Sequence, residues 1–446
     1  MNRLRPSVMW IVAAIALGAI AVWPFYARGG ADAARLASMP SAAPVTPDYL
    51  NRDRTVALWE RADRQHLRGD MLSPSKLSAE YLQRYRERGD IGDVVRALDA
   101  ARRSLRVQPY GNAAADVDLA SALVALHRFS DALAITKRIE RYQPGDPAML
   151  VREASIDLEL GRYDDARRIV DALRRLPAGA VDTLSRDTLL ARYDELTGNL
   201  AQARERFERT TAAANAVFAL GAQPRAWFDV RAGELAFEAG DNDAALAHER
   251  SALQTYPGYS EANRLLARVT CSLHQWAECA AAARASAEVV PYPEVLGYQA
   301  DAERALGRTA DAAQTADLIG TVARIGNAQH VSDRLLAIYD TEHGEHLEDA
   351  YRIAKGELAV RDDVFTDDTL AWAAAATGRW DEARTRSAKA LRLGTQSALL
   401  QYHAGIIALH FGDRVAAKRR LAAALALNDR FHPTYADDAR SRLARL

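Results

Sequence analysis

A six-residue pattern that returns along most of the chain constrains the fold more than any other feature of the sequence. It is GRYDDA from Gly161, GNLAQA from Gly198 and GRWDEA from Gly378. A fixed period of this kind indicates stacked supersecondary units. Most steps are close to 34 residues, and the first residues of the nine copies are His127, Gly161, Gly198, Gly240, His274, Gly307, Glu345, Gly378 and Gly412.

The sixth position of the pattern is always small, which indicates a close approach of two helices where a larger side chain would overpack the contact. Its residues are Ala132, Ala166, Ala203, Ala245, Cys279, Ala312, Ala350, Ala383 and Ala417. The third position is large in most copies, as in Tyr163 and Trp380, and fills the space between the helices. Prolines such as Pro144 and Pro257 follow several units, where a helix must end.

These features resemble the tetratricopeptide repeat (TPR), a helix–turn–helix unit of about 34 residues. The resemblance covers residues 113–433 with about nine units, and the unit around Glu345 departs most because it has no proper turn glycine. Residues 49–112 are predicted to form a helical N-terminal cap with a degenerate repeat, and residues 434–446 a capping helix. The resemblance implies an all-α fold, a right-handed superhelical solenoid. We predict that one transmembrane helix precedes it, for the reason given next.

The N-terminus carries an uncharged stretch between Arg5 and Arg28, which is long enough to span a membrane as a helix. We therefore predict a transmembrane anchor over residues 1–27, followed by a flexible tether rich in Ala, Gly and Pro over residues 28–48. The two arginines before the stretch favour a cytoplasmic N-terminus, which places the repeats in the periplasm of a bacterium, tethered to the inner membrane. A cleaved signal peptide, giving a periplasmic or secreted protein, is the alternative.

Charge and motifs exclude several classes of function. The formal net charge is −1 and the charges are interspersed, which argues against nucleic-acid binding. No dinucleotide fingerprint, phosphate-binding loop or nucleophile elbow occurs, so we predict no enzyme, catalytic residue or cofactor. Acid pairs such as Asp164–Asp165 and Asp381–Glu382 recur at one phase of the repeat, as expected where helices begin.

The cysteines and histidines give no strong prediction of a site. Cys279 occupies a small core position, whereas Cys271 falls at a groove-facing phase of the TPR unit, so we expect two free thiols; a disulfide is the alternative. His343 and His346, in EHGEH, lack a third ligand at a familiar spacing. We interpret them as an exposed polar turn and predict no metal site.

The resemblance places ligand contacts on the inner face of each first helix. In the middle units this phase holds Arg192, Glu195, Glu234, Arg264, Arg268, Asp301 and Arg304. Arg264 and Arg268 lie one helical turn apart, and arginine forks bind carboxylates well, so a partner with an acidic tail is one interpretation. The alternative is that these arginines pair with Glu234, Glu261 and Asp301 inside the groove.

The function that follows is recognition of another molecule. We expect a membrane-tethered scaffold that binds a protein or peptide in its concave groove on the extracytoplasmic side. The alternative is an accessory or chaperone-like factor for envelope assembly, polysaccharide export or secretion. The sequence leaves the partner and the oligomeric state open.

Overall fold

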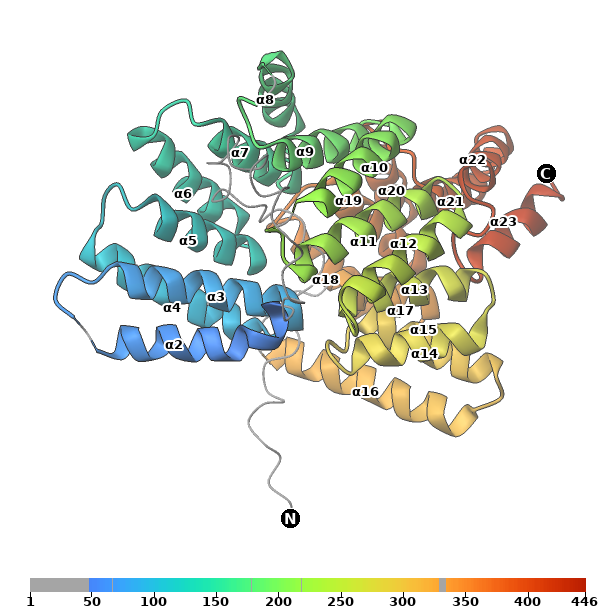
Figure 1. The fold of residues 1–446 in the computed structure, drawn as a ribbon. Helices are drawn as coiled ribbons and strands as arrows, with labels where there is room; N and C mark the ends of the chain where they lie inside the picture. The colour runs from blue at the N-terminus through green and yellow to red at the C-terminus, as the bar shows by residue number, and fades with distance from the viewer. Residues whose placement is uncertain (1–47, 66, 178, 218, 329–333) are drawn as a thin grey trace.

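The computed structural model is built from helices and describes residues 48–446 except 66, 178, 218 and 329–333 (Figure 1). Within these residues no strand occurs. The helices are η2 (Asp48–Asn51), α2 (Arg52–Arg64), α3 (Leu72–Arg88), α4 (Ile91–Val107), α5 (Ala113–Ala125), α6 (Phe129–Tyr142), α7 (Pro147–Glu159), α8 (Tyr163–Arg175), α9 (Thr183–Leu196), α10 (Leu200–Ala216), α11 (Ala222–Glu238), α12 (Asn242–Thr255), α13 (Ser260–Ser272), α14 (Trp276–Ala287), α15 (Pro293–Ala305), α16 (Thr309–Ala328), α17 (Arg334–His343), α18 (Leu347–Glu357), α19 (Val364–Ala376), α20 (Trp380–Ala390), α21 (Ala398–His410), α22 (Arg414–Leu427) and α23 (Tyr435–Leu443).

From α3 onward, successive helices pair into hairpins that stack along the chain, and α23 packs on the last of them (Figure 1). The architecture is therefore a TPR-like solenoid of helical hairpins. The small residue at the sixth position of the repeat is buried in every copy. This burial confirms the close helix–helix contact expected from the sequence.

Local chemistry explains where many helices begin. Asp146, Asp182, Asp241 and Asp413 each precede a helix, and each side chain accepts a hydrogen bond from a backbone N–H of its first turn. Such caps satisfy N–H groups that have no partner within the helix. The acid pairs of the repeat lie in the first turns of α8 and α20, which confirms their structural interpretation.

The hairpin at residues 334–357 has a turn glycine that the sequence alignment missed. Gly344 has a φ of 70°, in the left-handed region, one residue before the predicted position. His346 also adopts a positive φ, of 41°, directly before α18 begins at Leu347. The other turn glycines of the repeat lie two residues before the next helix, whereas Gly344 lies three residues before α18, so one residue inserted after the glycine moved it out of register.

The solenoid coils so tightly that segments far apart in sequence touch. The backbone N–H of Val364 donates to the Tyr163 hydroxyl, the Thr395 hydroxyl donates to the Leu196 carbonyl, and the Asn428 side chain donates to the Phe237 carbonyl. The paired residues are 201, 199 and 191 positions apart. These contacts join the start of α8 to the start of α19, the end of α9 to the segment before α21, and the end of α11 to the segment after α22. We call these the coil–coil contacts.

Within the described residues no helix is long and apolar enough to cross a membrane. The predicted anchor, residues 1–27, and all but the last residue of the predicted tether lie outside the described residues.

Candidate functional site

The first helices of the hairpins surround an inner cavity of about 1230 Å³. Its wall is built mainly from α3, α5, α7, α9, α11, α13, α17, α19 and α21, with a smaller contribution from α10. The volume exceeds the few hundred to about 1,000 Å³ typical of small-molecule pockets, so an extended segment of a larger ligand fits better.

Five of the seven predicted groove residues line the inner cavity. They are Arg192, Glu195, Glu234, Arg264 and Arg268. Asp301 and Arg304 do not line it, and a role in binding a partner stays a prediction for them. Both lie on α15, which contributes no side chain to the cavity wall.

The middle of the cavity wall is a ladder of ion pairs between neighbouring helices. Glu195 accepts from Arg192 at 2.8 Å and from Arg231 at 3.1 Å. Arg231 also pairs with Glu234, which lies 3.4 Å from Arg264. The ladder joins α9, α11 and α13, and it shows how charges of opposite sign on adjacent hairpins hold this wall together.

The two arginines that the sequence suggested as binding a ligand carboxylate already have carboxylate partners within the protein. Arg264 pairs with Glu261 at 2.9 Å and with Glu294 at 3.3 Å, besides Glu234. Arg268 lies 2.7 Å from Glu238 and its guanidinium stacks over the Phe237 ring. Internal pairing, the alternative left open by the sequence, therefore occurs at both residues. A role in binding a partner stays a prediction for them.

The ion pairs set the protonation of the wall. Burial by itself would disfavour the charged form of Glu234, but Arg231, Arg264 and Arg268 outweigh it, so the pKa of this carboxyl lies below its usual range. Burial likewise opposes the charge of Arg268, yet Glu238 raises its pKa. Both groups therefore stay ionised at neutral pH, and the ladder persists there.

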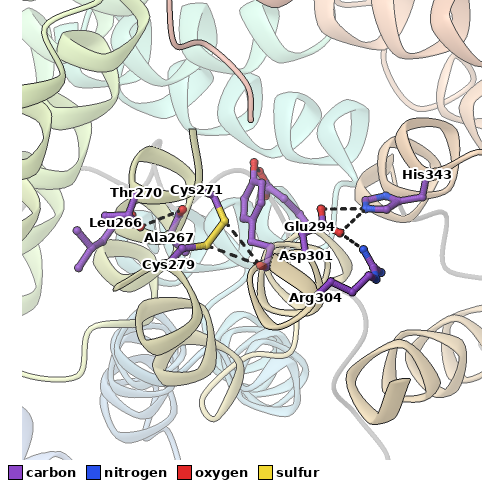
Figure 2. The surroundings of a disulfide bond; sticks show 10 residues. Leu266, Ala267, Thr270, Cys271, Cys279, Glu294, Asp301, Arg304 and His343 are labelled. Carbon is purple, nitrogen blue, oxygen red and sulfur yellow. Dashed lines mark hydrogen bonds and ion pairs between the residues drawn. A yellow bond between two sulfur atoms is a disulfide. The ribbon is translucent and has the colours of Figure 1, made fainter. Parts of the chain in front are cut away.

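Asp301 and Arg304 form a separate cluster with a histidine of the next hairpin, as Figure 2 shows. Asp301 accepts from Arg304, and His343 Nε2 lies 3.1 Å from its carboxylate. The His343 ring also stacks on Tyr339, with ring centroids 4.1 Å apart. His343, expected in an exposed polar turn, is instead partly buried in this contact.

Cys271 and Cys279 form a disulfide, so the expectation of two free thiols was wrong (Figure 2). The Cα atoms are 5.1 Å apart, within the range that a disulfide spans. Cys271 lies in the last turn of α13 and Cys279 in the first turn of α14, and both are fully buried between these helices. The expectation failed because the position of Cys271 in the repeat is a groove-facing one, whereas its side chain points into its own hairpin.

Four cavity-lining arginines were missed by the sequence analysis, namely Arg86, Arg152, Arg231 and Arg334. Arg152 lies on α7 and Arg86 near the end of α3, outside the phase that the TPR resemblance marks. The sequence carries no local signal for Arg152, because the next residue, Glu153, is an acid.

A buried histidine also faces the cavity. His403 Nδ1 lies 2.9 Å from the Asp368 carboxylate, and the ring stacks on Trp372 with centroids 4.2 Å apart. His403 is only 3% exposed, and its Nε2 atom is covered by other atoms. A ligand in the cavity therefore does not reach this nitrogen, and the pair is best explained as part of the packing between α19 and α21.

No family model matches the chain, and no curated protein matches it significantly. Among solved structures, a chain of the APC/C hetero-tetramer Cut9–Hcn1 is similar, with 12% identity, a TM-score of 0.32 and coverage of 89% of this chain and 94% of that chain. Human IFIT1, solved as a dimer with PPP-AAAA, is similar with 13% identity, a TM-score of 0.42 and coverage of 84% and 87%. Values this low transfer neither a partner nor a function.

Proposed function

We propose that this chain is a membrane-tethered scaffold that binds an extended segment of a partner protein in its inner cavity, on the extracytoplasmic side of a bacterial inner membrane. Its action is recognition, with no reaction catalysed. The observation that carries the proposal is the cavity of about 1230 Å³, lined by the first helices of most hairpins.

The chemistry of the wall suits a peptide. Apolar side chains such as Val117, Leu189 and Trp227 alternate with ion-paired arginines and carboxylates around the cavity. Binding sites combine apolar area with a few polar groups that fix orientation, and a peptide supplies both kinds of group. The paired charges also limit the desolvation cost of bringing a ligand into the cavity, because each charge keeps its partner.

Two observations support the compartment. The uncharged stretch between Arg5 and Arg28 has the length of a membrane-spanning helix. The buried disulfide between Cys271 and Cys279 fits an oxidising environment such as the periplasm, because disulfides are rare in a reducing cytoplasm.

Site-specific photocrosslinking tests the binding site. A photoreactive amino acid is placed at Ser155 or Thr188, which line the cavity on α7 and α9, in the full chain expressed in its own membranes. Ala201, exposed on α10 and outside the cavity wall, is the matched control position. We expect a discrete protein adduct from the two cavity positions and none from the control.

Equal adducts from the cavity positions and Ala201 would refute binding in the cavity.

The compartment is tested separately with a membrane-impermeant thiol reagent applied to intact spheroplasts after reduction. Labelling of Cys271 and Cys279 only after reduction and partial unfolding is expected. Labelling that requires rupture of the membrane would instead place the repeats in the cytoplasm.

A further inference from the structure

The helix α2 packs on the solenoid with one face and leaves its other face exposed. On the packed face, Val56 is 1% exposed and belongs to the hydrophobic core. On the outer face lie Arg54, Leu58 and Arg61, all exposed and spaced four and three residues apart, which places them along one stripe of the helix. Figure 1 shows α2 at the lower edge of the molecule, beside α3.

The charged residues of α2 are divided between its two sides. Its three acids each have a partner on α3 or α4, and the pairs are Asp53–Arg88, Glu60–Tyr81 and Asp63–Arg103, at 2.9, 2.7 and 2.7 Å. Arg54 and Arg61, by contrast, have no carboxylate within 4 Å among the residues that the structure describes. The outer face of α2 is therefore positive, although the chain as a whole has a formal net charge of −1.

Exposed leucines accompany these arginines. Leu58 is 53% exposed on the outer face of α2, and Leu50, directly before this helix, is 65% exposed. Leu67, in the segment after α2, is 62% exposed, and Leu72 at the start of α3 is 55% exposed. Single exposed leucines are ordinary, but exposed leucines interspersed with arginines are typical of a helix that lies in the interface of a lipid bilayer.

The positive surface continues from α2 onto α4. The last turns of α4 lie against the segment that follows α2, because the Ser104 hydroxyl donates to the Met71 carbonyl at 2.7 Å. Arg102 and Arg106 are exposed on these turns, and Asp99, one turn earlier, offsets one of their charges. Arg68 is exposed in the segment after α2. We call Arg54, Arg61, Arg68, Arg102 and Arg106 the basic edge; none of them has a carboxylate within 4 Å in the described part of the chain.

The position of the basic edge along the chain favours a membrane surface as its partner. The helix α2 begins at Arg52, whereas the predicted anchor ends at residue 27. A tether over residues 28–48 would span roughly 25 Å on average. The anchor would thus keep this end of the solenoid close to the lipid at a high effective concentration, which a soluble acidic partner would not have.

We propose that the basic edge lies on the surface of the membrane that holds the anchor, with its arginines at anionic phospholipid headgroups. This inference rests on the proposed membrane tether and adds an orientation to it. Guanidinium groups donate hydrogen bonds to phosphate oxygens, and basic residues close to anionic lipid attract it in a manner that salt screens. Leu58 and Leu67 would enter the boundary between headgroups and acyl chains. The contact would fix how the inner cavity faces the bilayer.

Quenching of a fluorescent label by lipid tests this contact. Ala57, exposed on α2, is replaced by cysteine in the full chain and labelled with bimane; the native cysteines are joined in the buried disulfide. The protein is reconstituted into vesicles of phosphatidylcholine, with or without roughly one third phosphatidylglycerol, that carry a nitroxide lipid. The reference label is at Val415, which is 80% exposed on α22, far from α2 in Figure 1. In anionic vesicles we expect at least ~3-fold stronger quenching at position 57 than at position 415, with loss of the difference at high salt.

Charge reversal connects the quenching to the arginines. Arg54→Glu/Arg61→Glu should reduce quenching at position 57 to the level at position 415. The matched control is Lys418→Glu/Arg419→Glu, the same change of charge at exposed residues of α22, and it should leave the quenching unchanged. Thermal unfolding without vesicles checks the fold. If charge reversal lowers Tm, Arg54→Gln/Arg61→Gln should still lose at least ~2-fold of the quenching.

Three results would overturn the proposal: equal quenching at positions 57 and 415, equal quenching at position 57 in neutral and anionic vesicles, or quenching that persists in both arginine variants. Protection of the label by an added acidic protein without quenching by lipid would also overturn it, in favour of a soluble partner.

Flotation of the same samples separates the basic edge from the tether. A chain that floats with both kinds of vesicle but shows no quenching at position 57 refutes the basic edge alone. A chain that floats only with anionic vesicles, and no longer does so after charge reversal, supports the basic edge and refutes the anchor. A chain that floats with neither refutes both.

Discussion

Two hairpin turns with nearly the same sequence have very different surroundings. GRYDDA at residues 161–166 and GRWDEA at residues 378–383 both start with a glycine of positive φ, 73° at Gly161 and 78° at Gly378. A Cβ added at Gly161 would lie 2.2 Å from the backbone oxygen of Asp362, whereas a Cβ at Gly378 would meet nothing within 4 Å. The first turn is a coil–coil contact and the second is open.

The residues around the two turns show the same difference. At the first turn, Tyr163 accepts a hydrogen bond from the Val364 backbone and Arg361 lies near Glu159. At the second, the equivalent aromatic residue Trp380 stacks on His410 of the next hairpin, 3.7 Å away. The repeat therefore specifies a hairpin in both places, but only the turn at Gly161 takes part in the contact that closes the coil. The second hairpin enters the same contact through Val364, at the start of α19 and away from its turn.

The largest effect is expected from removing the charge at the centre of the coil–coil contact. Arg361 is 3% exposed and lies 3.3 Å from Glu357, 3.6 Å from Asp363 and 3.8 Å from Glu159. Arg361→Ala leaves buried carboxylates without their cation and should lower the free energy of unfolding by about 3–5 kcal/mol, measured by urea denaturation.

The matched control for that variant lies in the open turn. Arg384 pairs with Asp381 at 3.1 Å, but its side chain is 61% exposed. Arg384→Ala should change stability by less than about 0.5 kcal/mol, because water screens an exposed pair. Similar losses in the two variants would contradict the difference between the turns.

Substitution of the two turn glycines by alanine should give the next largest difference in stability. In either turn, alanine at a positive φ costs roughly 1–2 kcal/mol. At Gly161 the added methyl group also clashes with the Asp362 carbonyl, and overpacking adds about 1–3 kcal/mol. Thermal unfolding of Gly161→Ala and Gly378→Ala should rank them in that order. If Gly378→Ala were the less stable variant, the coil–coil contact would be refuted.

The same contact is expected to make the free energy of unfolding fall at low pH. Burial disfavours the charge of Asp363, but Arg334 and Arg361 outweigh it and lower its pKa. A lowered pKa gives stability that is present above the ordinary carboxyl pKa and is lost as pH falls through the folded-state value. Asp363→Asn should therefore be about 1–2 kcal/mol less stable than wild type at pH 7, with a gap that narrows below about pH 4.

That pH dependence is measured by denaturation of both proteins from pH 7 to pH 2.5. Asp381→Asn, in the open turn, is the control and should follow wild type, since its side chain is 89% exposed. A gap between wild type and Asp363→Asn that stays constant with pH would show that the carboxylate charge contributes nothing.

The smallest loss of stability is expected from removing the Tyr163 hydroxyl, which joins the segments at Tyr163 and Val364. Tyr163→Phe removes the acceptor of the Val364 N–H, 2.9 Å away, and leaves the ring packing intact. A loss of about 1 kcal/mol is expected from one hydrogen bond of this kind. Tyr110→Phe, at an exposed tyrosine, should have no measurable effect, and hydrogen exchange at Val364 would report the local opening directly.

The hairpins could be predicted because their signals are local. A small residue at the sixth position and a turn residue that tolerates positive φ act within one unit, and both recur in the structure from His127 to Gly412. The insertion beside Gly344 shows the limit of this reasoning, since a shift of one residue hid the turn glycine.

The candidate site was predicted only in part. The predicted groove residues include Arg192, Glu234 and Arg264, which line the cavity wall. They also include Asp301 and Arg304 on α15, which contributes nothing to that wall. The sequence left open whether Arg264 binds a ligand or pairs internally, because its partners Glu234 and Glu294 lie on neighbouring hairpins. Arg152 was missed for a different reason, since nothing local reveals that its side chain lines the cavity.

The sequence by itself determined the helical hairpin, its period and the close contact inside each unit, because these depend on residues fewer than about 40 positions apart. The tertiary structure decided which turns meet, which arginines have carboxylate partners and how Cys271 meets Cys279. The first two outcomes depend on the rotation from each hairpin to the next, whereas the disulfide depends on how the two helices of one hairpin face each other. Small rotations accumulate along a solenoid and bring Tyr163 to Val364, 201 residues away.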